Sequence, residues 1–281
     1  MHSSPSQTFD FNPSATRLLR HGCLFLTVIL AVAAFLPTAL AVDPPPDGGY
    51  PNANTAEGDN ALFSLTTGFA DTASGFEALY SNTAGYNNTA IGWKALHTNT
   101  TGNSNTAIGV AALYHSTTGG GNTAIGFTAL FDNTTGAENT ATGLNALLNN
   151  TTGNSNTATG FFALFNNTAS NNTATGAEAL QFNTTGDGNT ASGYRALYSN
   201  TTGLDNTANG LEALSNNTRG NFNTATGVIA LLSNTTGGLN TATGVAALLS
   251  NTTGGGNTAT GEGALLQKQP AAATRPTVST P

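Results

Sequence analysis

The apolar and polar positions of this chain recur with a period of seventeen residues. The period is Asn-Thr-Ala-x-Gly-x-x-Ala-Leu-x-x-Asn-Thr-Thr-Gly-x-x, and it is clearest over residues 122–138 and 240–256. Internal periods of this length are typical of solenoids, in which each repeat buries its apolar face against its neighbours. Position 1 of the thirteen units is occupied by Asn54, Asp71, Asn88, Asn105, Asn122, Asn139, Asn156, Asn172, Asn189, Asn206, Asn223, Asn240 and Asn257.

The residue types of the repeat favour short strands and turns over helix. Each unit holds several Asn, Thr and Gly residues, and no apolar stripe with a 3.6-residue period continues across unit boundaries. We expect Thr-Ala-x-Gly (positions 2–5) and Ala-Leu-x-x (positions 8–11) each to form a strand of about three to five residues. We expect Asn-Thr-Thr-Gly (positions 12–15) to turn the chain, with its Gly at positive φ.

One repeat then makes one coil, so the predicted fold is all-β. It is a parallel β-solenoid of thirteen coils of about seventeen residues, covering residues 54–267. Stacked coils place equivalent residues about 4.8 Å apart, and thirteen coils make a body about 60 Å long. The unit that starts at Asn156 has one residue fewer, and we expect a tighter corner there.

Every recurring position becomes a ladder along such a body. Positions 3 and 8 are Ala and position 9 is Leu in all thirteen units. We expect these three ladders to lie inside the coil, where small Ala side chains permit close approach and each buried Leu contributes about 1.5 to 3 kcal/mol.

Two further rows are apolar, at positions 6 and 10. The position-6 row consists of Phe76, Trp93, Val110, Phe127, Leu144, Phe161, Tyr194, Leu211, Val228 and Val245. The position-10 row consists of Phe63, Tyr80, Tyr114, Phe131, Leu148, Phe165, Tyr198, Leu232, Leu249 and Leu266. If the inner ladders fill the coil, at least one row faces outward and marks an interface, which predicts a homo-oligomer. That both rows belong to the core is an equally open interpretation.

Residues 1–41 have the order of a secretory signal peptide. Arg17 and Arg20 precede an apolar run over residues 24–36, and Ala39-Leu40-Ala41 follows as a small-residue cleavage site. The apolar run is shorter than the roughly 20 residues that span a bilayer. We therefore predict cleavage after Ala41, a secreted or cell-surface location, and no membrane span in the mature chain.

Two short segments flank the predicted repeat domain. Residues 42–53 include three consecutive prolines and two glycines, which is typical of an extended linker. Residues 268–281 abandon the repeat and are rich in Pro, Ala and Thr, which predicts a disordered tail.

The charge of the chain limits its partners. It has 14 acidic and 7 basic residues and a formal net charge of −7, which opposes binding to nucleic acid and to anionic membranes. Cys23 is the one cysteine and lies in the predicted signal peptide. The mature chain therefore has no disulfide and no thiolate metal ligand.

Three consecutive units carry the pentapeptide Asn-Thr-Ala-Ile-Gly, at residues 88–92, 105–109 and 122–126. These runs resemble the head repeats of trimeric autotransporter adhesins, the YadA-like or haemagglutinin-type head, and the resemblance covers residues 54–267. It implies a left-handed parallel β-roll with one repeat per coil, a homotrimer, and binding to host or matrix surfaces. The units here are longer than the family's usual repeat, and the chain shows neither the family's stalk nor its membrane anchor.

From this resemblance we expect a structural, adhesin-like repeat protein that binds an extracellular protein, a glycan or a matrix ligand. Similar repeat arrays also occur in phage fibres, so a fibre-like structural protein is an alternative.

No pattern for catalysis, a cofactor or a metal stands out. His97 and His115 lie in successive units, but two histidines without a third ligand do not specify a zinc site. The acids fall at variable repeat positions, and no G-x-S-x-G motif is present. We therefore predict a protein that is not an enzyme and assign no catalytic, cofactor or metal residue. Asn-x-Thr triplets such as the one at Asn99 are interpreted as turn chemistry.

A third functional hypothesis rests on Thr-Ala-Thr, which recurs within residues 139–143, 156–160, 223–227, 240–244 and 257–261. In a strand both threonines point the same way, about 7 Å apart, in rows about 4.8 Å apart. Such a flat ladder resembles insect-type ice-binding surfaces. Ordinary strand stabilisation by Thr is the alternative explanation.

Overall fold

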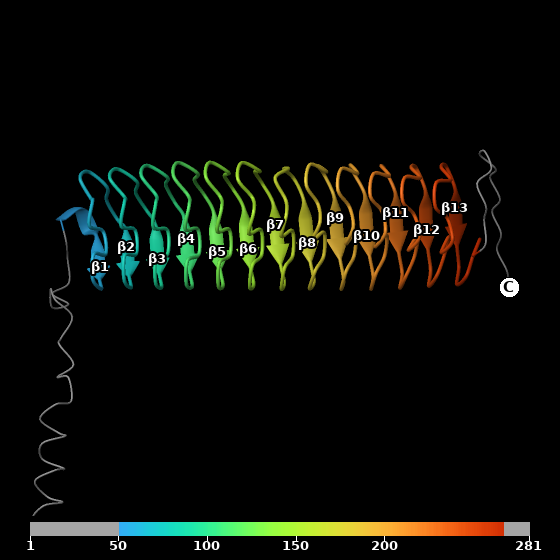
Figure 1. Ribbon diagram of the computed structural model, residues 1–281, viewed down its shortest axis with the longest axis horizontal. Coiled ribbons are helices and arrows are strands. Elements are labelled where there is room, and N and C mark those ends of the chain that lie inside the picture. Colours follow the sequence, from blue (N-terminus) through green and yellow to red (C-terminus); the bar gives the residue numbers. More distant parts are fainter. Residues whose placement is uncertain (1–50, 267–281) are drawn as a thin grey trace, which may run out of the picture. The chain divides into compact units, whose positions relative to one another are not determined.

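The computed structural model describes residues 51–266, which form a rod of stacked coils (Figure 1). Each coil contributes one three-residue strand, and thirteen parallel strands pair in chain order into a single sheet. The strands are β1 (Thr55–Glu57), β2 (Thr72–Ser74), β3 (Thr89–Ile91), β4 (Thr106–Ile108), β5 (Thr123–Ile125), β6 (Thr140–Thr142), β7 (Thr157–Thr159), β8 (Thr173–Thr175), β9 (Thr190–Ser192), β10 (Thr207–Asn209), β11 (Thr224–Thr226), β12 (Thr241–Thr243) and β13 (Thr258–Thr260). The predicted all-β parallel solenoid is confirmed.

The rod begins before β1, in a short 3-10 turn, η1 (Pro51–Ala53). The carbonyl of Asn52 accepts a hydrogen bond from the amide of Ala70 at 2.9 Å, so residues at the end of the predicted linker pair with the first coil. The predicted signal peptide (1–41), the remainder of the linker (42–50) and the predicted tail (268–281) lie outside the described residues.

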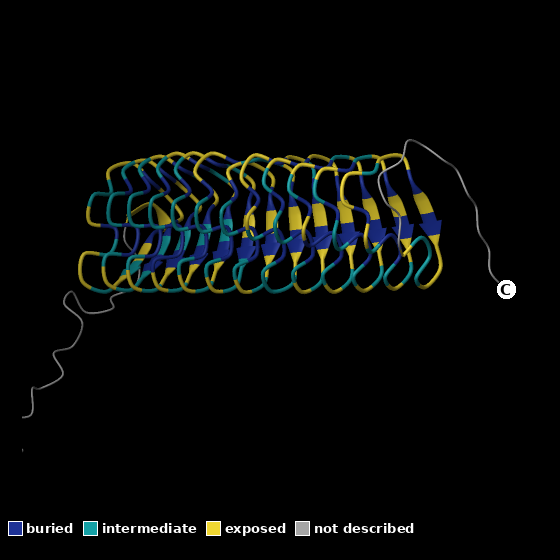
Figure 2. Cartoon of the chain, turned by 45° about the vertical axis from the view of Figure 1, so that its right-hand side comes forward, coloured by how far each residue is buried: buried dark blue, intermediate teal, exposed yellow. Residues whose placement is uncertain are grey.

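The register of the sheet follows the repeat. Thr55 pairs with Thr72 at one end and Thr241 with Thr258 at the other, so each ladder joins the same repeat position in successive coils. In each strand from β2 to β13 the central Ala is buried, while the residues on either side of it are partly or fully exposed. Figure 2 shows this alternation as dark blue strand centres between yellow or teal ends.

The glycine at position 5 ends every strand, and its conformation requires glycine. Gly126 has φ of 137°, and a Cβ there would lie 2.6 Å from the carbonyl oxygen of Gly143 in the next coil. Both the left-handed conformation and the close approach of neighbouring coils exclude a side chain.

The expectation of a second strand at positions 8–11 is wrong. Leu130, at position 9, has φ of 52°, and a residue in the left-handed region cannot continue a strand. The amide of Asn133 donates to the carbonyl of Leu130 at 3.2 Å, which closes a turn. Coil-to-coil bonding persists, since the amide of Leu130 donates to the carbonyl of Ala146 at 3.0 Å. Turns replace the second strand because the chain must close a narrow coil within seventeen residues.

The expectation of positive φ at the Gly of Asn-Thr-Thr-Gly is also wrong. Gly136, at position 15, is not among the positive-φ residues, whereas the position-5 glycines are. Position 15 is Gly because there is no room for a side chain. A Cβ on Gly136 would lie 2.3 Å from Oδ1 of Asn133 and 2.5 Å from the carbonyl oxygen of Gly153.

The core contains the three predicted ladders. From coil 2 to coil 12 the Ala side chains at positions 3 and 8 and the Leu side chains at position 9 are buried, nearly all with no exposed surface. They form one continuous apolar cluster along the rod.

The coil that starts at Asn156 absorbs its missing residue at the corner, as expected. The carbonyl of Ala169 takes the place of the usual Gly carbonyl and accepts hydrogen bonds from Nδ2 of Asn156 and of Asn167, both at 2.8 Å. The pairing of Thr157 with Thr173 keeps the sheet in register across the deletion.

Candidate functional site

Two ladders of asparagine complete the interior, and sequence reasoning missed them. At position 1, Nδ2 of Asn122 donates to Oδ1 of Asn105 at 3.1 Å and to the carbonyl of Gly136 at 2.9 Å. At position 12, Nδ2 of Asn150 donates to Oδ1 of Asn133 at 3.0 Å and to the carbonyl of Gly153 at 2.9 Å. Both ladders are buried. The corner carbonyls of Gly136 and Gly153 each accept from two side-chain amides, one from each ladder.

The recurrence of Asn at the same repeat position was the sequence signal that could have predicted these ladders. Position 1 is Asn in every unit except the one that begins with Asp71, and a turn alone does not demand the same polar residue at each copy. Burial of the position-12 ladder also includes the asparagines of the Asn-x-Thr triplets. Asn99, Asn133 and Asn150 have no exposed surface, so these side chains are not accessible to a modifying enzyme in the folded protein.

The filled interior places the position-6 row outside. Its members are 39% to 55% exposed, from Phe76 at 39% to Phe127 at 55%, and all lie on consecutive coils except where Ala177 interrupts the row. The prediction that at least one apolar row faces outward is confirmed, and the interpretation of both rows as core is wrong. The outward row is a candidate recognition surface, since a contiguous exposed apolar stripe is unusual on a monomeric protein.

The position-10 row is half-buried through most of the rod and covers a corner. In the first coils its rings stack along the rod axis: Phe63 on Tyr80 at 5.1 Å, Tyr80 on His97 at 5.2 Å, and His97 on Tyr114 at 4.9 Å between centroids. Each pair is within 4° of parallel. These ring faces are occupied by neighbouring rings, so the row contributes packing more than a free binding surface.

The sheet face changes character along the rod. In β3, β4 and β5 position 4 is Ile91, Ile108 and Ile125, which are 42%, 37% and 40% exposed. Together with Trp93, Val110 and Phe127, two residues further along each coil, they form an exposed apolar patch on coils 3–5. From β6 onward position 4 is Thr, Ser or Asn, and six of these strands read Thr-Ala-Thr.

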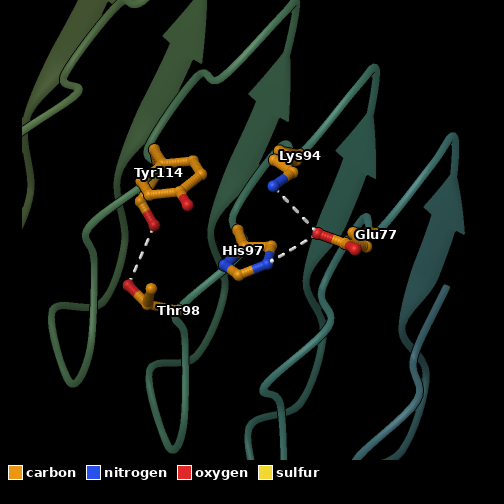
Figure 3. A network of polar contacts seen from close by, with 5 residues as sticks. All are labelled: Glu77, Lys94, His97, Thr98 and Tyr114. Carbon is orange, nitrogen blue, oxygen red and sulfur yellow. Dashed lines mark hydrogen bonds and ion pairs between the residues drawn. The ribbon is translucent and has the colours of Figure 1, made fainter. Parts of the chain in front are cut away.

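A small ion-pair cluster lies beside the stacked rings (Figure 3). Oε2 of Glu77 lies 3.1 Å from Nζ of Lys94 and 3.1 Å from Nε2 of His97. Nζ of Lys94 also lies 4.8 Å from the centre of the Trp93 ring, a cation–π distance. The neighbouring Thr98 hydroxyl donates to the carbonyl of Tyr114 at 2.8 Å.

The cluster shifts the pKa of two of its members. Burial lowers the pKa of His97 below 6.5, although the hydrogen bond to Glu77 acts in the opposite direction. Burial raises the pKa of Glu77, but the hydrogen bonds and charges of Lys94 and His97 outweigh it and hold the pKa below 4.5. The carboxylate therefore stays ionised and engaged with neighbouring side chains.

His115 does not join this cluster. Its ring meets Tyr114 edge-on at 4.6 Å, and its Nε2 lies 3.8 Å from Oδ1 of Asp132. Within residues 51–266 no three His, Cys, Asp or Glu side chains gather closely enough to hold a metal ion. The same residues contain no helix with the length and hydropathy needed to cross a membrane.

Comparison with protein-family models, with curated proteins and with solved structures found no match. The resemblance to adhesin heads therefore stays a prediction from the repeat sequence.

Proposed function

We propose that the mature chain is a secreted or cell-surface binding rod without enzymatic activity, and that copies of the chain associate through its position-6 row. One observation carries this proposal: the row is exposed along the rod although the core is complete without it. In a solenoid whose interior is already filled by Ala, Leu and Asn, large apolar side chains that stay about half exposed contribute less to folding than buried ones. Their exposure is best explained by a partner that covers them.

The same row supports a homotrimer, as the adhesin-head resemblance implies. The row places one apolar side chain on nearly every coil. A second copy of the chain has the same spacing and can therefore contact the row at every coil, which few unrelated proteins could do. In a trimer the remaining outer ladders would face an extracellular protein, a glycan or a matrix ligand.

Light scattering on the chain from Val42 onward tests the assembly. We expect three times the mass of one chain at micromolar concentration, and about one chain mass for Phe127→Ser combined with Phe161→Ser. Leu239→Ser is the matched control, because Leu239 is 68% exposed but lies outside the row. A wild-type protein that stays monomeric would remove the trimer.

Surface binding is tested separately with collagen-coated and glycan-coated beads as probes. We expect retention of the wild-type rod on at least one of them. Retention of Phe127→Ser with Phe161→Ser should be lower, because a single rod lacks the multivalency of a trimer. Equal retention of the two proteins would show that surface binding does not depend on assembly through the row. Retention on neither bead type would count against surface binding.

A second candidate function, ice binding, is favoured by the Thr face. Positions 2 and 4 of β7, β8, β11, β12 and β13 are exposed Thr residues in register, which places hydroxyl and methyl groups in two rows along the sheet. Ser192 in β9 and Asn209 in β10 replace Thr at position 4 between the two groups of strands. Thr175→Lys in β8 should abolish inhibition of ice recrystallisation, whereas Thr185→Lys, at an exposed corner, should not. Absence of any activity in the wild-type protein would dismiss this function.

A further inference from the structure

Both ends of the rod expose ladder positions that are sealed in every inner coil. At the start, Ala56 and Ala61 are only partly buried, and at the other end so are Ala264 and Leu265. Their equivalents in coils 2–12 are buried. The last described coil therefore exposes apolar side chains of the interior ladders, as the first coil does at the opposite end of the rod.

The backbone edges of the two ends are complementary as well. In inner coils the position-2 amide donates forward, as Thr241 does to the carbonyl of Asn257 at 2.7 Å. The position-5 amide donates backward, as Gly75 does to the carbonyl of Glu57 at 2.7 Å. Within residues 51–266 no coil follows the one that contains Thr258, and no strand precedes β1. The described residues therefore offer no neighbouring coil to the amides of Thr258 and Gly58. A second copy placed one rod length along the axis would supply both acceptors.

This placement would continue the sheet from one chain into the next. Thr258 would pair with Thr55 in the register that joins Thr241 to Thr258, Leu265 would cover Leu62, and Leu266 would lie beside the ring of Phe63. The contact repeats the interface that already joins the coils within one chain.

The charges at the ends oppose this contact. Position 6 is apolar in coils 2–12 but is Asp59 in coil 1 and Glu262 in coil 13. Ladder spacing would set these two carboxylates about 5 Å apart across the junction. Like charges at neighbouring ladder positions repel each other, and charged side chains on strand edges are a known means of limiting edge-to-edge association.

We propose that the two ends of the rod form a head-to-tail interface between copies of this chain, which Asp59 and Glu262 weaken. Such a contact does not close on itself and generates filaments. Screening or removal of the two charges therefore favours assembly, and the strength of the contact depends on ionic strength. The proposal is independent of the position-6 row, because lateral association changes the width of a particle and end-to-end association changes its length.

The test compares Asp59→Asn with Glu262→Gln against the wild type, in the chain from Val42 onward, by sedimentation velocity and electron microscopy. We expect the neutralised variant to form filaments at a concentration about tenfold lower than the wild type at low salt. The difference should shrink at high salt. Asp205→Asn with Glu212→Gln is the matched control, since it removes the same charges from the middle of the rod and should behave like the wild type.

A second pair of substitutions identifies the surface. In the neutralised variant, Thr258→Pro removes the forward amide and should restore single rods, whereas Thr258→Val keeps that amide and should leave the filaments intact. Filaments that survive Thr258→Pro would mean that another surface is used, and would overturn the proposal. Single rods of the neutralised variant at every concentration would overturn it as well.

Discussion

Oδ1 of Asn99 is buried without a hydrogen-bond donor because the next residue of its ladder is Ser116. In neighbouring coils the following Asn supplies that donor, as Asn150 does for Oδ1 of Asn133 at 3.0 Å. Ser116 is too short to reach, and its own Oγ is also without a partner among the described residues. One departure from the repeat thus leaves two buried polar atoms unpaired.

Ser116→Asn should therefore stabilise the protein. The new amide would donate to Oδ1 of Asn99 and to the carbonyl of Gly119, as the repeat does elsewhere, with a gain of about 1 kcal/mol in the free energy of unfolding. Urea unfolding followed by circular dichroism measures the gain. Ser104→Asn, at an exposed position where other coils carry Asn, should change stability little, and an equal gain there would refute the ladder explanation.

Asp71 makes the first coils sensitive to pH. It replaces Asn at position 1, and its carboxylate accepts bonds from the amide of Asn88 at 2.8 Å and from Nδ2 of Asn82 at 2.9 Å. Burial raises the pKa of Asp71 above 3.8, although these hydrogen bonds lower it. The folded state therefore binds the proton more tightly than the unfolded state, and stability falls as pH rises from about 3.8 through the folded pKa.

Asp71→Asn should remove this loss. Asn does not ionise, but its Nδ2 would replace the oxygen that accepts from Nδ2 of Asn82. We therefore expect the stability of the variant relative to the wild type to rise toward pH 7, by on the order of 1 kcal/mol. The advantage should shrink toward pH 3.5. Thermal unfolding across this range tests the prediction, and an advantage that does not depend on pH would contradict it.

His97 should give the opposite dependence on pH. Its folded pKa lies below 6.5, mainly through burial, so the unfolded state binds the proton more tightly. Stability is then present above pH 6.5 and is lost as pH falls through the folded pKa. His97→Phe keeps the ring stack with Tyr80 and Tyr114 but cannot titrate, and it should flatten the unfolding profile between about pH 5 and 7. A profile identical to that of the wild type would contradict the assignment.

Gly126→Ala should be among the most damaging single changes. The new Cβ would meet the carbonyl oxygen of Gly143 at 2.6 Å, in a residue held at φ of 137°, and we expect a loss of about 3 kcal/mol or more. Gly121→Asn is the control, because Gly121 also has positive φ but its Cβ would meet nothing closer than 3.7 Å. The control should lose less than about 0.5 kcal/mol, as measured by urea unfolding.

Leu147 lies inside the coil and Leu144 outside it, so substitutions at these two leucines test the assignment of the rows. Leu147→Ala removes a side chain with no exposed surface and should cost about 2 to 5 kcal/mol. Leu144→Ala removes a side chain that is 42% exposed, three residues away, and should cost less than about 1 kcal/mol in a monomeric rod. Similar costs for the two variants would contradict the assignment of the position-6 row to the surface.

The repeat predicted the fold because its period and its Ala and Leu positions are properties of the sequence. It did not predict how the coil closes, since that depends on contacts between coils. Leu130 adopts φ of 52°, which its own propensity opposes, because the turn buries its side chain. The Asn-x-Thr triplet at Asn99 indicated turn chemistry, although its side chain lies inside the rod. The side-chain amides of the two asparagine ladders occupy the interior together with Ala and Leu, and this leaves the position-6 row outside. The sequence pattern does not show this occupancy.

The two asparagine ladders also give the rod an electrical direction. Nδ2 of most ladder amides donates to the Oδ1 of the preceding coil, as Asn105 does to Asn88 and Asn99 to Asn82. Because all these side-chain dipoles are parallel, they polarise one another and add up along the axis, with the positive end at the first coil. A β-solenoid of this kind thereby acquires a macrodipole of the sort associated with helices, built from its side chains.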